Sequence, residues 1–357
     1  MIGDGDARNA DAATEETCET DAEATIEETL EADADATAEE TRETDAVDDE
    51  TTDGSPPTVS GLSVSVLDAV RSRPPAEVAL VVLPLPALLV VVSAFPGTEA
   101  WRLSLAAEGV FESRWTLWTA FASSFVHTSS GHLFDNVVNY WLLLAVAYPL
   151  SIVAGWRRRL LYVSLTYLAV VPLVSAWATI VALGGLTDAP TAGFSDVNSA
   201  YLGYLVAVWF AALATETDRT STSAPGSDAA HRVESAGVDA RWSVVVVFAS
   251  LAVAYVVPSG VSYFPALPAI GALFAAAAAV AAGGLYAAVG RPRVVGIGLA
   301  PPRELLYVVG ASVVFAGVIG SLVVVPFGSN VFAHLVGYVV GFTVPFLGVV
   351  ADGRHSR

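Results

Sequence analysis

Three short polar segments interrupt an otherwise apolar chain, and each stands at the start of a long hydrophobic run. They are His127-x4-His132-x3-Asn136, Gly193-Phe194-Ser195-Asp196 and Ala333-His334-x2-Gly337-x3-Gly341. Ionisable and hydrogen-bonding groups are costly at membrane depth, and they commonly serve a function there. A serine, several histidines and an asparagine are the side chains that acyl transfer on an amide requires. The first hypothesis is therefore hydrolysis of a peptide bond.

Ser195 is the candidate nucleophile and His334 is the candidate base. A serine hydroxyl reacts slowly until a base accepts its proton. Of the five histidines, only His127, His132 and His334 are expected at the depth of Ser195. Asn330 precedes His334 and small residues follow it, so another helix could approach that imidazole closely. The sequence therefore predicts a Ser195–His334 dyad.

The remaining polar residues could stabilise the oxyanion of a tetrahedral intermediate. His132 and Asn136 are four residues apart, so they share one face of a helix. The backbone N–H of Ser195 falls at a helix start, where amides lack partners and the helix dipole favours negative charge. His127, a turn or more upstream, is expected to brace the loop. Two alternatives stay open: Asn136 could join two helices, and Ser195 could serve only as a helix cap.

The composition indicates an integral membrane protein. The chain has 357 residues, of which 54% are hydrophobic and 15% are charged. The net charge of −19 arises mainly in residues 1–55, and the remaining part is close to neutral. So acidic a segment cannot form a core, and residues 1–75 are expected to be a disordered cytoplasmic tail. One cysteine, Cys18, cannot form an intramolecular disulfide or a zinc cluster.

Eight apolar runs are candidates for membrane-spanning helices, so the predicted fold is all-α and polytopic. The predicted spans are 77–95, 131–154, 160–184, 196–214, 242–258, 265–290, 305–326 and 330–350. They define a transmembrane domain over residues 76–351. The run 242–258 is short, and its boundaries are the least well defined together with those of the Ala/Gly-rich run 265–290.

The arginines indicate an orientation in the cell membrane. With eight spans, all arginine-bearing loops fall on one side except the segment 96–130, which holds only Arg102 and Arg114. The positive-inside rule then places both termini in the cytoplasm. The three polar segments consequently share one depth just below the outer surface. The tryptophan-rich stretch 98–118 is amphipathic and is expected to lie in the interface.

The three motifs, in this order, resemble the rhomboid family of intramembrane serine proteases. The likeness around the nucleophile includes Gly193, Ser195, Ala200 and Gly203, and the whole resemblance covers about residues 77–350. It implies a six-helix core, here with about two extra transmembrane helices. It also implies that transmembrane protein substrates are cleaved near the outer membrane face, within the lipid bilayer. No metal, cofactor or nucleic acid is expected.

The resemblance also implies a role for each site residue. Ser195 would be the nucleophile and His334 the base. His132 and Asn136 would assist the oxyanion, with His127 and Gly193 in support.

Several positions depart from the family pattern. Asp196 stands where a glycine usually follows the serine, Ser199 replaces an aromatic expected to stack on the base, and Thr119 follows Trp118 in place of an arginine. A carboxylate about 5 Å from an oxyanion would cost roughly 3 kcal/mol at an effective dielectric near 20. Asp196 could instead point to the aqueous surface, cap its helix or stay protonated.

Two further hypotheses stay open beside the protease. One is a catalytically inactive rhomboid-like protein that binds transmembrane clients, a reading that Asp196 and Ser199 motivate. The other, which is weaker, is a transporter that relays protons through histidines, although no broken-helix inverted repeat is evident.

Overall fold

The computed structural model describes residues 73–222, 239–257, 266–292, 301–325 and 329–355, which are almost entirely helical. The principal helices are α2 (Pro75–Val82), α3 (Pro84–Ala94), α4 (Arg114–Ala122), α5 (Ser130–Val153), α6 (Arg157–Leu183), α7 (Ser195–Thr222), α9 (Ser243–Val256), α10 (Pro268–Val289), α11 (Pro301–Val318) and α12 (Val331–His355). Short helical turns are η1 (Thr98–Trp101), η2 (Ser123–Phe125), η3 (Ala240–Trp242) and the π-helical η4 (Ile319–Val323), which continues α11.

The helices identify a multi-pass α-helical membrane protein. Six helices in the described residues are long and apolar enough to cross a membrane, and a seventh results if the bent pair α2–α3 is one span. Each predicted span overlaps one helix or two consecutive helical elements of the structure. Helix α9, which lies in the predicted span 242–258, is short for a membrane-spanning helix, because it has 14 residues. At 1.5 Å per residue it reaches about 21 Å, less than the roughly 30 Å of a hydrocarbon core.

The first predicted span, 77–95, is not one straight helix. It bends by 41° between α2 and α3, where Pro84 and Pro86 interrupt the backbone hydrogen bonds. Proline lacks an N–H, so Pro86 cannot donate to the carbonyl of Val82. The indole Nε1 of Trp141 donates to that oxygen at 3.2 Å instead. Helix α5 therefore stabilises the bend of its neighbour.

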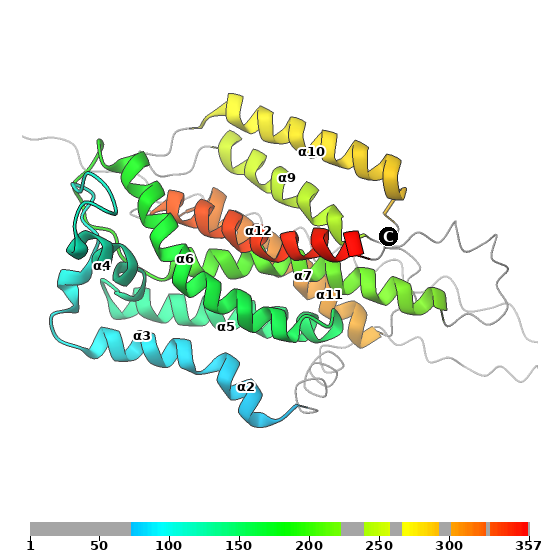
Figure 1. Ribbon diagram of the computed structural model, residues 1–357, viewed down its shortest axis with the longest axis horizontal. Coiled ribbons are helices and arrows are strands. Elements are labelled where there is room, and N and C mark those ends of the chain that lie inside the picture. The colour runs from blue at the N-terminus through cyan, green and yellow to red at the C-terminus, as the bar shows by residue number, and fades with distance from the viewer. Residues whose placement is uncertain (1–72, 223–238, 258–265, 293–300, 326–328, 356–357) are drawn as a thin grey trace, which may run out of the picture. The chain divides into compact units, whose positions relative to one another are not determined.

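Helix α7 forms the centre of the bundle. Most of its membrane-crossing segment is buried, and it packs against α5, α6, α11 and α12 (Figure 1). Large side chains such as Tyr201 and Tyr204 are fully buried along it. The helix that begins with Ser195 is therefore held on several sides.

Helices α9 and α10 lie side by side at the edge of the bundle, beyond α12 (Figure 1). They form an antiparallel pair in which the ring of Phe274 stacks on Tyr255 at 5.7 Å. Very little of α10 is buried. This pair occupies the chain between α7 and α11, so it leaves the contacts of α7 with α12 intact.

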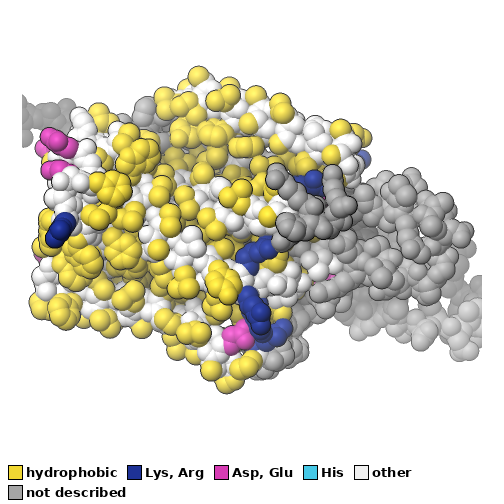
Figure 2. All heavy atoms as spheres, viewed as in Figure 1, with side chains coloured by type: hydrophobic (Ala, Val, Ile, Leu, Met, Phe, Trp, Pro, Cys, Tyr) yellow, Lys and Arg dark blue, Asp and Glu magenta, His cyan; other side chains and the backbone are white. Residues whose placement is uncertain are grey.

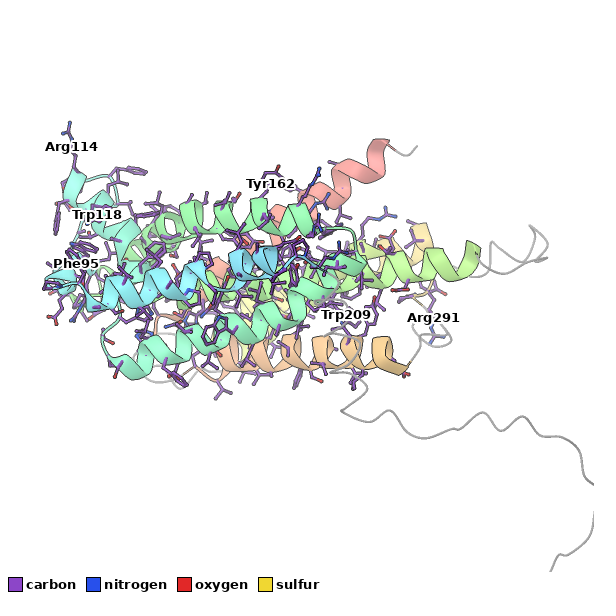
Figure 3. The ribbon with its side chains drawn as sticks, turned by 90° about the horizontal axis from the view of Figure 1, so that it is seen from below. Phe95, Arg114, Trp118, Tyr162, Trp209 and Arg291 are labelled. Carbon is purple, nitrogen blue, oxygen red and sulfur yellow. The ribbon has the colours of Figure 1, made fainter. Side chains whose placement is uncertain are left out.

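Apolar side chains cover most of the visible face, as expected for a surface in contact with lipid (Figure 2). Arg114 and Trp118 lie at one end of the bundle, and Arg291 lies towards the other (Figure 3). Near the start of α6, Arg157 forms an ion pair with Glu77 at 3.3 Å, and the guanidinium of Arg159 lies 4.3 Å from the Trp156 ring.

Candidate active site

The candidate site lies where α7 and α12 cross with their backbones in contact. Gly337 and Gly341 are four residues apart and face α7. A Cβ on Gly337 would collide with the carbonyl oxygen of Asp196, and one on Gly341 with that of Ala200. Because both helices advance in the same direction through these contacts, they run parallel here. Only glycine permits so close an approach.

This crossing brings Ser195 and His334 to one level. Ser199, one turn after Ser195, has its Cβ 3.2 Å from where a Cβ on Gly337 would lie. His334 is about one turn before Gly337. Both residues therefore lie one turn nearer the start of their helices than the contact itself. That these segments share one depth in the membrane stays a prediction.

The π-helical turn η4 fixes the orientation of His334. The ring Nδ1 lies 2.9 Å from the carbonyl oxygen of Ser321. A carbonyl only accepts hydrogen bonds, so Nδ1 carries the proton and Nε2 carries the lone pair in the neutral ring. Nε2 is buried and has no hydrogen-bond partner among the described residues. Ser195 Oγ is therefore not bonded to it in this conformation.

Gly193 and His132 pack directly against each other close to Ser195, the candidate nucleophile. Gly193 has φ 130°, a left-handed conformation that favours glycine. A Cβ at this position would lie 2.5 Å from His132 Cε1. The Gly193 N–H donates to the carbonyl of Ser123 at 3.0 Å, and His132 Nδ1 lies 3.4 Å from Thr128 Oγ1. The His132 ring thus contacts Gly193, which precedes Ser195 by two residues.

His127 packs edge-on against His132, with ring centroids 5.2 Å apart. Neither of its ring nitrogens has a hydrogen-bond partner in the part of the chain that the structure describes. Burial, aided by repulsion from His132, lowers the pKa of His127 to about 4. The ring is therefore neutral at physiological pH, and its contact with His132 fits the bracing role.

Asn136 joins two helices through its side-chain amide. Its Nδ2 donates to the carbonyl of His132 at 3.0 Å, and its Oδ1 accepts from Asn198 Nδ2 at 3.1 Å. Both groups are buried. This is the helix-joining alternative that the sequence left open, and a contribution of Asn136 to an oxyanion site stays a prediction.

Asp196 does not reach the aqueous surface, because the residue is only 3% exposed. Its Oδ2 accepts hydrogen bonds from Ser175 Oγ at 2.6 Å and Ser124 Oγ at 2.8 Å. Its Oδ1 accepts from the backbone N–H of Val197 at 2.8 Å, one of the amides at the start of α7 that lack an intrahelical acceptor. Asp196 is thus bound to η2 and α6.

The structure also shows the contacts of Ser199 and of the Trp118–Thr119 pair, where the sequence departs from the rhomboid pattern. Ser199 lies in the α7–α12 crossing, where its hydroxyl donates to the carbonyl of Ser195 at 2.8 Å. Trp118 packs edge-on against Trp101 at 5.3 Å. Thr119 is buried and donates to the carbonyl of Thr116 at 3.1 Å. A large aromatic at position 199 would not fit between these helices.

Three contributors escaped the sequence reasoning: Ser124, Ser175 and the carbonyl of Ser321. The first two are hydroxyls in apolar segments, which is a signal at membrane depth. The third is a backbone group in a π-helical turn, and no residue type in the sequence predicts such a turn.

Comparison of the chain with family models, curated proteins and solved structures yields no match. The described residues contain no group of three or more His, Cys, Asp and Glu side chains that could hold a metal ion.

Proposed function

We propose that this protein is an intramembrane serine endopeptidase of the rhomboid type, with Ser195 as nucleophile and His334 as base. One observation carries the proposal. The hydrogen bond between His334 Nδ1 and Ser321 leaves an unpaired Nε2 at the level of Ser195. A neutral imidazole with a free Nε2 is the form that accepts a proton from a serine.

In the first step, Ser195 Oγ attacks the carbonyl carbon of the scissile peptide bond while its proton passes to His334 Nε2. The carbonyl π electrons move to oxygen, which becomes an oxyanion. The imidazolium is stabilised because Nδ1–H continues to donate to Ser321. Catalytic hydrogen bonds commonly tighten only when substrate binds, so the missing Ser195–His334 bond is compatible with this role.

The oxyanion would lie beside the first turn of α7. The N–H of Ser195 belongs to the helix start, where amides lack intrahelical acceptors and the dipole favours negative charge. The His132 ring lies next to Gly193, close enough to the nucleophile turn to contribute a donor. Losing one such donor typically raises the barrier by roughly 3–4 kcal/mol.

The intermediate then collapses. The C–N bond breaks, and the leaving amine takes the proton from His334 Nε2. Water attacks the acyl group on Ser195, again with Nε2 as the base, and this releases the second product and restores the hydroxyl. The reaction consumes one water and needs no metal or cofactor.

The substrates are transmembrane proteins cleaved near the outer face of the cell membrane. The polar residues of the site stand at the ends of helices that are otherwise apolar, so a substrate helix would meet them near the bilayer surface. With the site near the outer face, both termini are cytoplasmic, which is the orientation that the arginine distribution favours.

Cleavage of a fluorescent transmembrane substrate in liposomes tests the proposal. Wild type should cleave it, and Ser195→Ala and His334→Ala should each lower kcat by at least about a thousandfold. Ser312→Ala is the matched control, because its exposed hydroxyl bonds only to Val308 of its own helix. Equal turnover by wild type and Ser195→Ala would contradict the proposal.

A catalytically inactive rhomboid-like protein that binds transmembrane clients is the second candidate. Asp196 favours it, because a buried acid directly follows Ser195 where the family pattern has a glycine. Client binding by wild type and Ser195→Ala alike, with no cleavage by either, would support this candidate.

A further inference from the structure

Two adjacent residues of η2 hold the residues on either side of the nucleophile. The carbonyl of Ser123 accepts from the N–H of Gly193 at 3.0 Å. The hydroxyl of Ser124 donates to Asp196 Oδ2 at 2.8 Å. Ser195 lies between these two attachments. Residues far apart in the chain thereby fix the start of α7 at two points.

A third attachment comes from α6. Ser175 Oγ donates to the same oxygen of Asp196 at 2.6 Å, while Oδ1 accepts from the Val197 N–H. The buried carboxylate therefore has donors on both oxygens, which its desolvation requires.

We infer that Asp196 is a positioning residue, which with Ser124 and Ser175 locks the first turn of α7 so that Ser195 faces His334. This inference rests on the proposed function. The carboxylate does not contact the reacting atoms. It acts through the backbone, since Asp196 is the next residue after the nucleophile.

The packing around this turn agrees with a positioning role. Phe194, which is fully buried, packs on Phe125 with ring centroids 5.9 Å apart. The carbonyl of Asp196 also lies against α12 at Gly337. A turn held by η2, α6 and α12 has little freedom to rotate, and a nucleophile displaced by 1 Å can lose about 100-fold in rate.

The test compares Ser124→Ala, Ser175→Ala and Asp196→Asn with wild type in the liposome cleavage assay. Each variant should lower kcat about 10- to 100-fold with KM unchanged, because the substrate contacts are preserved. Ser175→Thr keeps the hydroxyl and should retain most of the wild-type kcat. Asp196→Ala combined with Ser175→Ala should lose little more than Asp196→Ala alone, because both substitutions remove the hydrogen bond between Ser175 and Asp196.

Hydrogen exchange of the 194–200 segment provides a second readout that needs no turnover. Exchange in that segment should accelerate in Ser175→Ala and remain as in wild type in the control Ser312→Ala. Unchanged exchange, or unchanged kcat in Ser175→Ala and Asp196→Asn while wild type cleaves, would overturn the positioning role alone. No cleavage by wild type would instead overturn the proposed function on which it rests.

Discussion

The imidazole Nδ1 of His334 lies 2.9 Å from the carbonyl oxygen of Ser321. Ser321 belongs to η4, a five-residue π-helical turn at the end of α11. Such turns displace a carbonyl from the regular α-helical pattern and are frequent at functional sites. In the proposed protease, this contact would take the place of the aromatic that the rhomboid resemblance expects to stack on the base, because the small Ser199 stands at that position. The orientation of the His334 ring thus depends on a backbone group.

Deleting Gly320 should abolish most of the activity, because it removes the extra residue of the π-helical turn and shifts the Ser321 carbonyl. We expect kcat to fall by about 100-fold, the scale of a 1 Å misplacement. Gly320→Ala is the matched control, since a Cβ there would meet nothing within 4 Å. Cleavage rates in liposomes measure the effect, and full activity of the deletion variant would contradict the role of η4.

Gly337→Ala should destabilise the protein, because a Cβ would collide with the carbonyl of Asp196 and separate α7 from α12. Overpacking of this kind typically costs about 1–3 kcal/mol. Gly283→Ala, on the exposed α10, meets nothing within 4 Å and should leave the unfolding temperature unchanged or slightly higher. Thermal unfolding in detergent compares the two, and equal unfolding temperatures would show that the helices do not touch at Gly337.

Acidification should destabilise the protein through His127. Its pKa is about 4 in the folded protein, below the ordinary value of 6.5. Between these values the unfolded chain binds the proton more readily, so stability is unaffected above pH 6.5 and falls as the pH drops towards 4. The loss amounts to at most about 3 kcal/mol. Unfolding temperatures of wild type should therefore decline over this range.

His127→Gln should make the decline shallower, because glutamine does not titrate. The unfolding temperatures of the two proteins, measured at matched pH values, provide the comparison. Parallel curves would mean that the pKa of His127 is not lowered by folding.

Much of the fold could be predicted from apolar length alone. Lipid allows few backbone arrangements, so an uninterrupted run such as 160–184 has to be a helix, and α6 lies there. The bend at Pro84 was harder to predict, because the mean hydropathy of a window is the same for a straight and a bent run. The shortness of α9 was already visible in the short run 242–258. The prolines themselves were visible in the sequence.

The candidate site could be predicted only in outline. Residue spacing identified Ser195, His334 and the glycines that let their helices approach. The environment of Asp196 could not be predicted, because its partners Ser124 and Ser175 lie on other elements and only packing brings them together. The sequence did not determine where the Asp196 side chain points, and in the structure that side chain is buried beside the hydroxyls of Ser124 and Ser175.

Covalent labelling of the purified protein with a fluorophosphonate probe, followed by mapping of the modified peptide, tests the central claim most directly. We predict modification of Ser195 in wild type, and none in His334→Ala or in Ser195→Ala on the same time scale. Ser199→Ala should still be labelled, since that hydroxyl bonds only to the Ser195 carbonyl. An unlabelled wild type, or equal labelling of Ser195 with and without the His334 imidazole, would contradict the account.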